Sequence, residues 1–233
     1  MSYISFRNVT KEYIVGKNLV KAINDISFEI EKGEFTVILG ASGSGKSTTL
    51  NLLGGMDKAT SGNIVIDNRN ITQFSESELT MYRREDMGFV FQFYNLIPSL
   101  NAYENVDVAT RLGKNPMDTL EAIKAVGLEK RIKHFPSEMS GGELQRISIA
   151  RAICKNPKVL LCDEPTGALD SETGKLILIL LHKMAKQYGK TVIIVTHNAA
   201  IAPAADKVIH LRDGKIIKVD NNKTPVSLEE VSW

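Results

Sequence analysis

The chain has 233 residues, of which 43% are hydrophobic and 24% are charged, and its formal net charge is +2. This length and composition suit one large globular domain, or a core with a subdomain, and exclude a disordered or fibrous chain. The basic clusters, Arg83-Arg84 and residues 130–133, are short. A solvated helix face explains them better than a nucleic-acid-binding surface, so we expect no nucleic-acid partner.

Features that would place the chain in a membrane are missing from the sequence. The first residues lack the apolar block of a signal peptide, and no run reaches the roughly 18 apolar residues of a membrane-spanning helix. Cys154 and Cys162 lie in apolar patterns, and no other Cys or His is placed near them at metal-ligand spacing. We therefore interpret both as small packing residues of a protein in a reducing compartment. We therefore expect a cytosolic protein that reaches a membrane only through a partner.

Two kinds of strand are predicted along the chain. Apolar and polar residues alternate over 3–9, 20–30 and 62–67, which is typical of half-buried antiparallel strands. Residues 35–39, 87–91, 159–162 and 191–195 are almost continuously apolar, as parallel strands covered on both faces are. Together they predict an α/β fold with a mostly parallel sheet and an amino-terminal antiparallel β-subdomain.

Residues 40–47 read Gly-Ala-Ser-Gly-Ser-Gly-Lys-Ser, which matches the phosphate-loop (P-loop) pattern. They follow a predicted strand and lead into a helical start, as that motif requires. The glycines let successive N–H groups turn toward an anion, and the helix directs its positive dipole end to the same place. Lys46 adds a positive charge for the outer phosphates, and the Ser47 hydroxyl is a natural Mg²⁺ ligand. We assign the triphosphate site to Gly40, Ser42, Gly43, Ser44, Gly45, Lys46, Ser47 and Thr48.

Helical spacing appears over residues 76–85, 102–110, 117–126, 141–153 and 171–188. No parallel-type strand is visible between Gln92 and Pro157, so the helices there are interpreted as an insertion into the core. We expect one domain, with a nucleotide-binding core at 1–91 and 156–219, a helical subdomain at 92–155 and a loosely attached tail at 220–233. In the last helix, Asp170 or Ser171 is the expected cap, and one apolar stripe is predicted from Leu176, Ile177, Leu180, Leu181, Met184 and Tyr188.

The helix at 141–153 begins with Ser140-Gly141-Gly142-Glu143. Ser at the N-cap and Glu three residues later make a capping box, and helix initiation alone explains both. It does not explain two successive glycines, because each costs about 1 kcal/mol in a helix relative to Ala. They allow the backbone to approach an anion closely at the positive end of the helix. Ser140, Gly141 and Gly142 are therefore a second candidate anion site.

The apolar run that begins at Lys158 ends in two carboxylates, Asp163 and Glu164. Asp163, at the carboxyl end of a strand, can hold Mg²⁺ directly or through water, as the usual partner of a phosphate-loop Ser. Glu164 is expected to point elsewhere, because neighbouring side chains on a strand diverge, and there it can take a proton from water. A base beside a triphosphate favours hydrolysis over binding alone.

Taken together, these motifs resemble those of the ATP-binding-cassette (ABC) ATPases, over about residues 3–218. Residues 140–142 are similar to the family signature Leu-Ser-Gly-Gly-Gln, with Met139 and Glu143 at its outer positions. Four further residues match family motifs in order: Tyr13 the aromatic residue that stacks on adenine, Gln92 the Q-loop glutamine, Asp170 the D-loop aspartate and His197 the switch histidine.

This resemblance implies a mechanism that needs two copies of the chain. The copies would close head to tail around two ATP molecules, each lying between the phosphate loop of one copy and residues 140–142 of the other. Ser47, Gln92 and Asp163 would surround Mg²⁺. Glu164 would polarise the attacking water, and Asp170 would link the two sites. Lys46 and His197 would hold the γ-phosphate.

A closer resemblance, over residues 51–57, 88–98 and 104–106, is to the MacB/LolD/FtsE group of bacterial ABC ATPases. It implies a homodimer that powers an FtsX/MacB-type membrane permease from the inner face of the cell membrane, for export, lipoprotein or peptide handling, or transmembrane signalling. The apolar run 93–98 lies where the family docks its permease. Packing of the helical subdomain onto the core explains that run equally well.

Other classes of protein compete with this interpretation. A phosphate-loop kinase is disfavoured by Glu164 beside Asp163 and by Thr196-His197, and a DNA-repair or chromosome-structuring ATPase by the lack of a coiled-coil or zinc insertion. Intact Lys46, Asp163, Glu164 and His197 disfavour a non-catalytic cassette.

Overall fold

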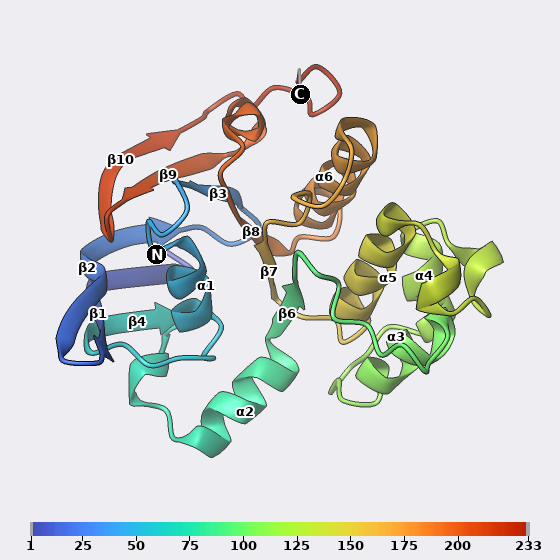
Figure 1. Ribbon diagram of the computed structural model, residues 1–233, viewed down its shortest axis with the longest axis horizontal. Helices are drawn as coiled ribbons and strands as arrows, with labels where there is room; N and C mark the ends of the chain where they lie inside the picture. The colour runs from blue at the N-terminus through green and yellow to red at the C-terminus, as the bar shows by residue number, and fades with distance from the viewer. Residues whose placement is uncertain (1, 232–233) are drawn as a thin grey trace.

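The computed structural model describes residues 2–231, which form two β-sheets and a group of helices (Figure 1). The larger sheet has the strand order β10-β9-β3-β8-β7-β6, and the smaller has the order β2-β1-β4-β5. The larger sheet consists of β3 (Phe35–Leu39), β6 (Met87–Val90), β7 (Val159–Asp163), β8 (Thr191–Thr196), β9 (Lys207–Arg212) and β10 (Lys215–Asn221). The smaller consists of β1 (Ile4–Val15), β2 (Asn18–Ile30), β4 (Ser61–Ile66) and β5 (Arg69–Asn70).

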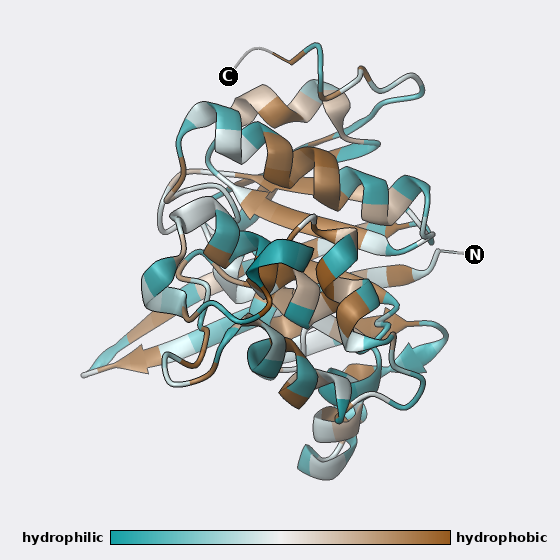
Figure 2. Ribbon diagram, turned by 90° about the vertical axis from the view of Figure 1, so that its right-hand side faces the viewer, coloured by the Kyte–Doolittle hydropathy of each residue, from teal (hydrophilic) through white to brown (hydrophobic). Residues whose placement is uncertain are grey.

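The predicted α/β fold with a mostly parallel sheet is confirmed. In the larger sheet only β10 pairs antiparallel, at one edge. Side chains alternate along each strand, so Leu160 and Cys162 of β7 join one hydrophobic cluster, and Val159 and Leu161 join the other. The sheet is thus buried on both faces, which is why its central strands are almost continuously apolar. These strands are the brown (hydrophobic) arrows behind the helices in Figure 2.

The smaller sheet is antiparallel throughout, as the alternating pattern predicts. Its β1–β2 hairpin is longer than expected, with pairing from Ile4–Ile30 to Val15–Asn18. β4 follows β1 only as far as the pair Thr10–Ser61, so the end of the hairpin extends beyond the rest of the sheet. The inner face of the sheet packs on α1 (Lys46–Leu53) in the second hydrophobic cluster.

The other helices are α2 (Glu76–Glu85), α3 (Ala102–Thr110), α4 (Thr119–Ala125), α5 (Gly141–Ile153) and α6 (Ser171–Lys186). α3, α4 and α5 lie between β6 and β7 in the chain and gather at the right of Figure 1. α4 begins later than predicted, because the Asp118 side chain accepts the N–H groups of Leu120 and Glu121 and caps the helix there. Within residues 2–231, we find no helix with the length and apolarity needed to span a bilayer.

The predicted apolar stripe of α6 is partly wrong. The face that packs on the sheet carries Ile177, Leu178, Leu181 and Met184, whereas Leu176 and Tyr188 are exposed. At 3.6 residues per turn, Leu176 lies on the opposite side of the helix from this face. Tyr188 lies beyond the last helical residue, so helical spacing no longer governs its direction.

The expected loose tail is also wrong, for the part of it that the structure describes. Residues 220 and 221 complete β10, and beyond them Leu228 and Val231 are buried in the first hydrophobic cluster. The Asn222 side-chain amide donates hydrogen bonds to the carbonyls of Ala202 and Ala205. The polar composition concealed these contacts, because two apolar side chains and one amide hold the segment. Residues 232 and 233 lie outside the described range.

Replacing Leu228 by Ala tests whether this segment contributes to stability. We expect the free energy of unfolding to fall by about 2 kcal/mol, because the substitution removes buried apolar surface and leaves a cavity. Urea unfolding of the whole chain measures this, with Val226→Ala as the control because Val226 is exposed. Equal stability of the two variants would contradict the burial of Leu228.

Candidate active site

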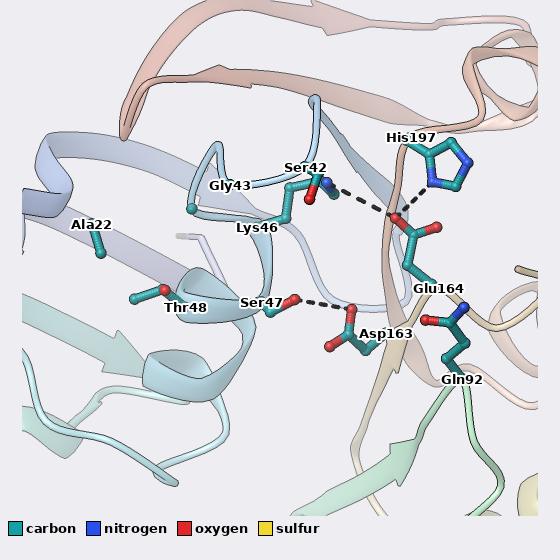
Figure 3. A pocket seen from close by; sticks show the side chains of 11 residues that line it. Ala22, Ser42, Gly43, Lys46, Ser47, Thr48, Gln92, Asp163, Glu164 and His197 are labelled. Carbon is teal, nitrogen blue, oxygen red and sulfur yellow. Dashed lines mark hydrogen bonds and ion pairs between the residues drawn. The ribbon is translucent and has the colours of Figure 1, made fainter.

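The inner strands β3, β8 and β7 all end on the same side of the larger sheet. A cleft of about 660 Å³ opens at these carboxyl ends. The strand register brings them together, because Leu39 pairs with Thr196 and Asp163 pairs with Val195. Side chains from five separate segments face this cleft (Figure 3). Its lining consists of Ala22, Ser42, Gly43, Gly45, Lys46, Ser47, Thr48, Gln92, Asp163, Glu164 and His197.

The loop 40–47 has the geometry of an anion cradle. Gly45 has a φ of 102°, and a Cβ there would strike the Ala22 carbonyl and the Ile23 side chain. Gly40 does not line the cleft, but a Cβ there would collide with Ser44 and with the Leu211 carbonyl. The Ser44 hydroxyl is buried and has no hydrogen-bond partner within residues 2–231. Buried hydroxyls normally have partners, so an anion oxygen in the loop fits this site.

Lys46 is held inside the loop with its charge directed at the cleft. Its Nζ donates to the carbonyls of Gly40, at 2.9 Å, and Ala41, at 3.0 Å. The same Nζ lies 3.9 Å from Glu164 Oε1. The two carbonyls are neutral acceptors, and charged phosphate oxygens in the cleft can take their place as stronger ones.

Ser47 and Asp163 form the candidate metal site. The Ser47 hydroxyl donates to Asp163 Oδ1 over 3.2 Å. Burial raises the pKa of Asp163, and the negative charge of Glu164 raises it further. The Ser47 hydrogen bond and the positive charge of Lys46 lower the pKa, but the net shift is upward. Gln92 lines the same cleft and packs against Gly167. Carboxylate, hydroxyl and amide oxygens are ligands suited to Mg²⁺, and a buried carboxylate is the kind of group that a cation stabilises.

Glu164 and Asp163 point toward different partners, as the strand pattern predicted, but they share one cleft. Both carboxylates line the cleft, because β7 ends at Asp163 and Glu164 has a left-handed φ of 44°. Glu164 Oε1 lies 3.0 Å from His197 Nδ1, and Oε2 accepts a hydrogen bond of 2.9 Å from the Thr196 hydroxyl. The carboxylate is thus fixed in orientation at the cleft, where a general base beside a phosphate would need to be.

Ser140, Gly141, Gly142 and Asp170 do not line this cleft. Ser140 is exposed and caps α5, with its N–H donating to Glu143 Oε2 and its Oγ accepting from the Glu143 N–H. Asp170 caps α6 by accepting from the Thr173 N–H. Packing within the single chain also favours glycine at both positions. A Cβ at Gly142 would collide with Thr173 Cγ2, and a Cβ at Gly141 would lie 2.9 Å from the Tyr94 hydroxyl. The residues predicted from the sequence therefore divide into two groups.

Tyr13 lies beside the cleft rather than in its lining. Its hydroxyl donates to Asp57 Oδ2 over 2.6 Å, and the Lys11 ammonium group lies 4.8 Å from the centre of its ring. Burial raises the pKa of Tyr13, Asp57 raises it further, and a hydrogen bond with Thr48 opposes both. Since Thr48 lines the cleft, Tyr13 adjoins that end of it.

Two residues of the site were not identified from the sequence. Ala22 lies within β2, and an alanine side chain carries no functional group that would mark it as a site residue. It reaches the cleft because β2 packs against the phosphate loop at Gly45. Thr196 was noted only as the neighbour of His197. Its role as a donor to Glu164 depends on the shared register of β7 and β8, which sequence spacing does not contain.

Replacing Asp163 by Asn should stabilise the protein in the absence of nucleotide. Because the folded-state pKa of Asp163 is raised, its ionisation destabilises the fold at neutral pH. We expect a higher Tm at pH 7 and no gain below the ordinary Asp pKa of about 3.9. Thermal unfolding against pH measures this, with exposed Asp213→Asn as the control. A lower Tm at pH 7 would contradict the desolvation of Asp163.

A parallel sheet with a phosphate loop after one strand and an Asp-Glu pair after another defines a P-loop nucleoside triphosphatase. The model of the family described as ABC transporter matches residues 23–167. The chain is 44% identical over 222 residues to an uncharacterized ABC transporter ATP-binding protein, MJ0796 of Methanocaldococcus jannaschii, covering 91% of this chain and 94% of that protein. It is 41% identical to the macrolide export ATP-binding/permease protein MacB of Shigella flexneri, covering 98% of this chain but 35% of MacB.

Among solved structures, a dimeric post-hydrolysis state of the ATP-binding cassette MJ0796, bound to ADP and Pi, has a TM-score of 0.86. Its sequence is 41% identical, and the match covers 94% of this chain and 98% of that one. The chain belongs to the ABC transporter family.

Proposed function

We propose that this chain hydrolyses ATP as the motor subunit of an ABC transporter and acts as a homodimer bridged by ATP. The observation that carries the proposal is the convergence of Lys46, Ser47, Asp163 and Glu164 on one cleft. A cradle with a lysine favours triphosphate binding, and a fixed carboxylate beside it favours hydrolysis. The MJ0796 cassette, which this chain resembles, was captured with ADP and Pi.

Within one chain, each group has a distinct task. Lys46 exchanges the carbonyls of Gly40 and Ala41 for phosphate oxygens and neutralises charge on the outer phosphates. Glu164 accepts the proton of the attacking water, and His197 and Thr196 keep its carboxylate in place. Ser47, Asp163 and Gln92 would hold Mg²⁺, which neutralises phosphate charge when bound. Tyr13 would supply a ring for adenine.

The second group of residues supports the proposal of a dimer. The N–H groups at the start of α5 can bind an anion, and this start carries Ser140, Gly141 and Gly142. These residues do not line the nucleotide cleft of the same chain. In our proposal they face the γ-phosphate held by a partner copy, and Asp170 lies beside that contact. The MJ0796 cassette was solved as a dimer, which agrees with this arrangement. Residues 92–155 are then the unit that carries the second anion site.

We expect Glu164→Gln to bind ATP and to hydrolyse it at least about 100-fold more slowly, because general base catalysis contributes at least that factor. The variant should accumulate as a dimer with ATP, since the bridging triphosphate persists. Phosphate release and sedimentation velocity measure the two effects. Full turnover in this variant would remove Glu164 from the base role.

A second substitution separates binding from dimerisation. Ser140→Arg, placed in the Glu164→Gln background, should leave ATP binding by the single chain intact, because Ser140 lies outside the cleft. It should abolish the ATP-dependent dimer, because a large side chain then occupies the second anion site. An unchanged dimer would refute the shared site.

The proposed membrane partner is an FtsX/MacB-type permease, which would hold the chain at the inner face of the cell membrane. MacB of Shigella flexneri is a macrolide export ATP-binding/permease protein, and its similarity to this chain supports the choice. The apolar run 93–98 is divided between two roles: Leu96 packs on the core, whereas Phe93 is 76% exposed and Ile97 43%. We assign Phe93 and Ile97 to the docking surface.

Replacing Phe93 by Asp should abolish recruitment to membranes that contain the permease while leaving Tm and basal ATP hydrolysis unchanged. The reason is that Phe93 is exposed and outside the cleft. Co-sedimentation with vesicles made from the native membrane measures recruitment. Ile217→Asp is the matched control, because Ile217 is 60% exposed on the distant strand β10. Equal recruitment of the two variants would contradict docking through Phe93.

Two alternative functions are separated by simple assays. A P-loop kinase would produce a phosphorylated acceptor, and a DNA-dependent ATPase would turn over faster with DNA. The nearly balanced charge of the chain does not favour a DNA-binding surface, because binding to the phosphate backbone depends on clustered positive charge. ATP hydrolysis that is independent of both supports the transporter subunit.

A further inference from the structure

The start of α5 already carries a negative charge at the place proposed for the second anion site. Glu143 is the third residue of the helix, and its Oε2 lies 2.8 Å from the Ser140 nitrogen and 3.0 Å from Ser140 Oγ. Hydrogen bonds from the Ser140 N–H and hydroxyl, together with Arg131, lower the pKa of Glu143. The carboxylate is therefore ionised at neutral pH, directly beside the hydroxyl that would meet a γ-phosphate.

Glu143 competes with that phosphate in two ways. A hydroxyl has one proton, so Ser140 Oγ–H cannot donate to Glu143 Oε2 and to a phosphate oxygen at the same time. Two anions at one helix start also repel each other and share one positive dipole end. An amide at position 143 would keep the capping box without adding a charge.

Arg131 offsets this charge from outside the helix. Its Nε lies 2.9 Å from Glu143 Oε1, so the two carboxylate oxygens have different partners, Arg131 on one side and Ser140 on the other. Arg131 ends a short helical turn, Glu129–Arg131, and its Nη1 also lies 3.1 Å from His134 Nε2. The His134 carbonyl in turn accepts the Ala102 N–H at the start of α3, so the segment that follows Arg131 is fixed to the subdomain.

We propose that Glu143 restrains ATP-driven dimerisation and that Arg131 is the positioning residue that sets the strength of this restraint. The pair tunes how much ATP is needed to close two copies of the chain. The inference rests on the proposed function, because it concerns the anion site that a partner's ATP would occupy. Its effect falls on dimer closure and leaves ATP binding by the single chain unchanged.

Sedimentation velocity in the Glu164→Gln background measures the ATP concentration that gives half-maximal dimer. Glu143→Gln removes the negative charge and should lower this concentration about fivefold. Arg131→Met removes the counterion and should raise it about fivefold. A factor of about five corresponds to the free energy of one partly exposed charge contact. The double variant should match Glu143→Gln alone, because Arg131 then has no carboxylate to offset. Arg131→Lys should restore part of the loss.

Lys130→Met is the matched control, because it removes one positive charge from the neighbouring exposed position. Its half-maximal concentration should equal that of the parent, as should binding of a fluorescent ATP analogue to every variant at low protein concentration. A double variant as weak as Arg131→Met would show that Arg131 has only a structural role, and unchanged single variants would refute the restraint. If the Glu164→Gln parent itself forms no ATP-dependent dimer, the proposed function fails and this inference fails with it.

Discussion

The shared register of the parallel strands β3, β7 and β8 brings the groups of the phosphate site together. Leu39 lies opposite Thr196, and Asp163 lies opposite Val195, so β3, β7 and β8 end at the same level. The phosphate loop, the two carboxylates and the histidine segment are far apart in sequence but follow directly from these ends. A shift of one strand by one residue would turn Asp163 or Thr196 into the hydrophobic core.

Local patterns predicted the fold and most residues that line the cleft, but not Ala22 or the Thr196 donor. The continuous apolar strands and the phosphate loop predict their own environment, because burial on both faces and anion binding each need a distinctive sequence. The errors arose where a contact between distant segments decides the outcome. The position of residues 222–231, for example, depends on two buried side chains that have no periodic signal.

The cleft holds its chemical groups at a cost to the isolated chain. Asp163 is a partly desolvated carboxylate, and Glu164 has a backbone conformation that costs on the order of 1 kcal/mol for a residue other than glycine. The loop leaves the Ser44 hydroxyl without a partner within the described residues. A ligand that supplies a cation and anionic oxygens would relieve several of these costs at once, so binding and stability are linked at this site.

The contact between Gly142 and Thr173 has a consequence for how this surface can evolve. Thr173 has little freedom to rotate away, because it is β-branched and lies in the first turn of α6. A residue larger than glycine at 142 would separate the starts of α5 and α6, and with them Ser140 from Asp170. Such a change is tolerable only together with a smaller side chain at 173. We therefore expect substitutions at positions 142 and 173 to occur together, because each side chain limits the size of the other.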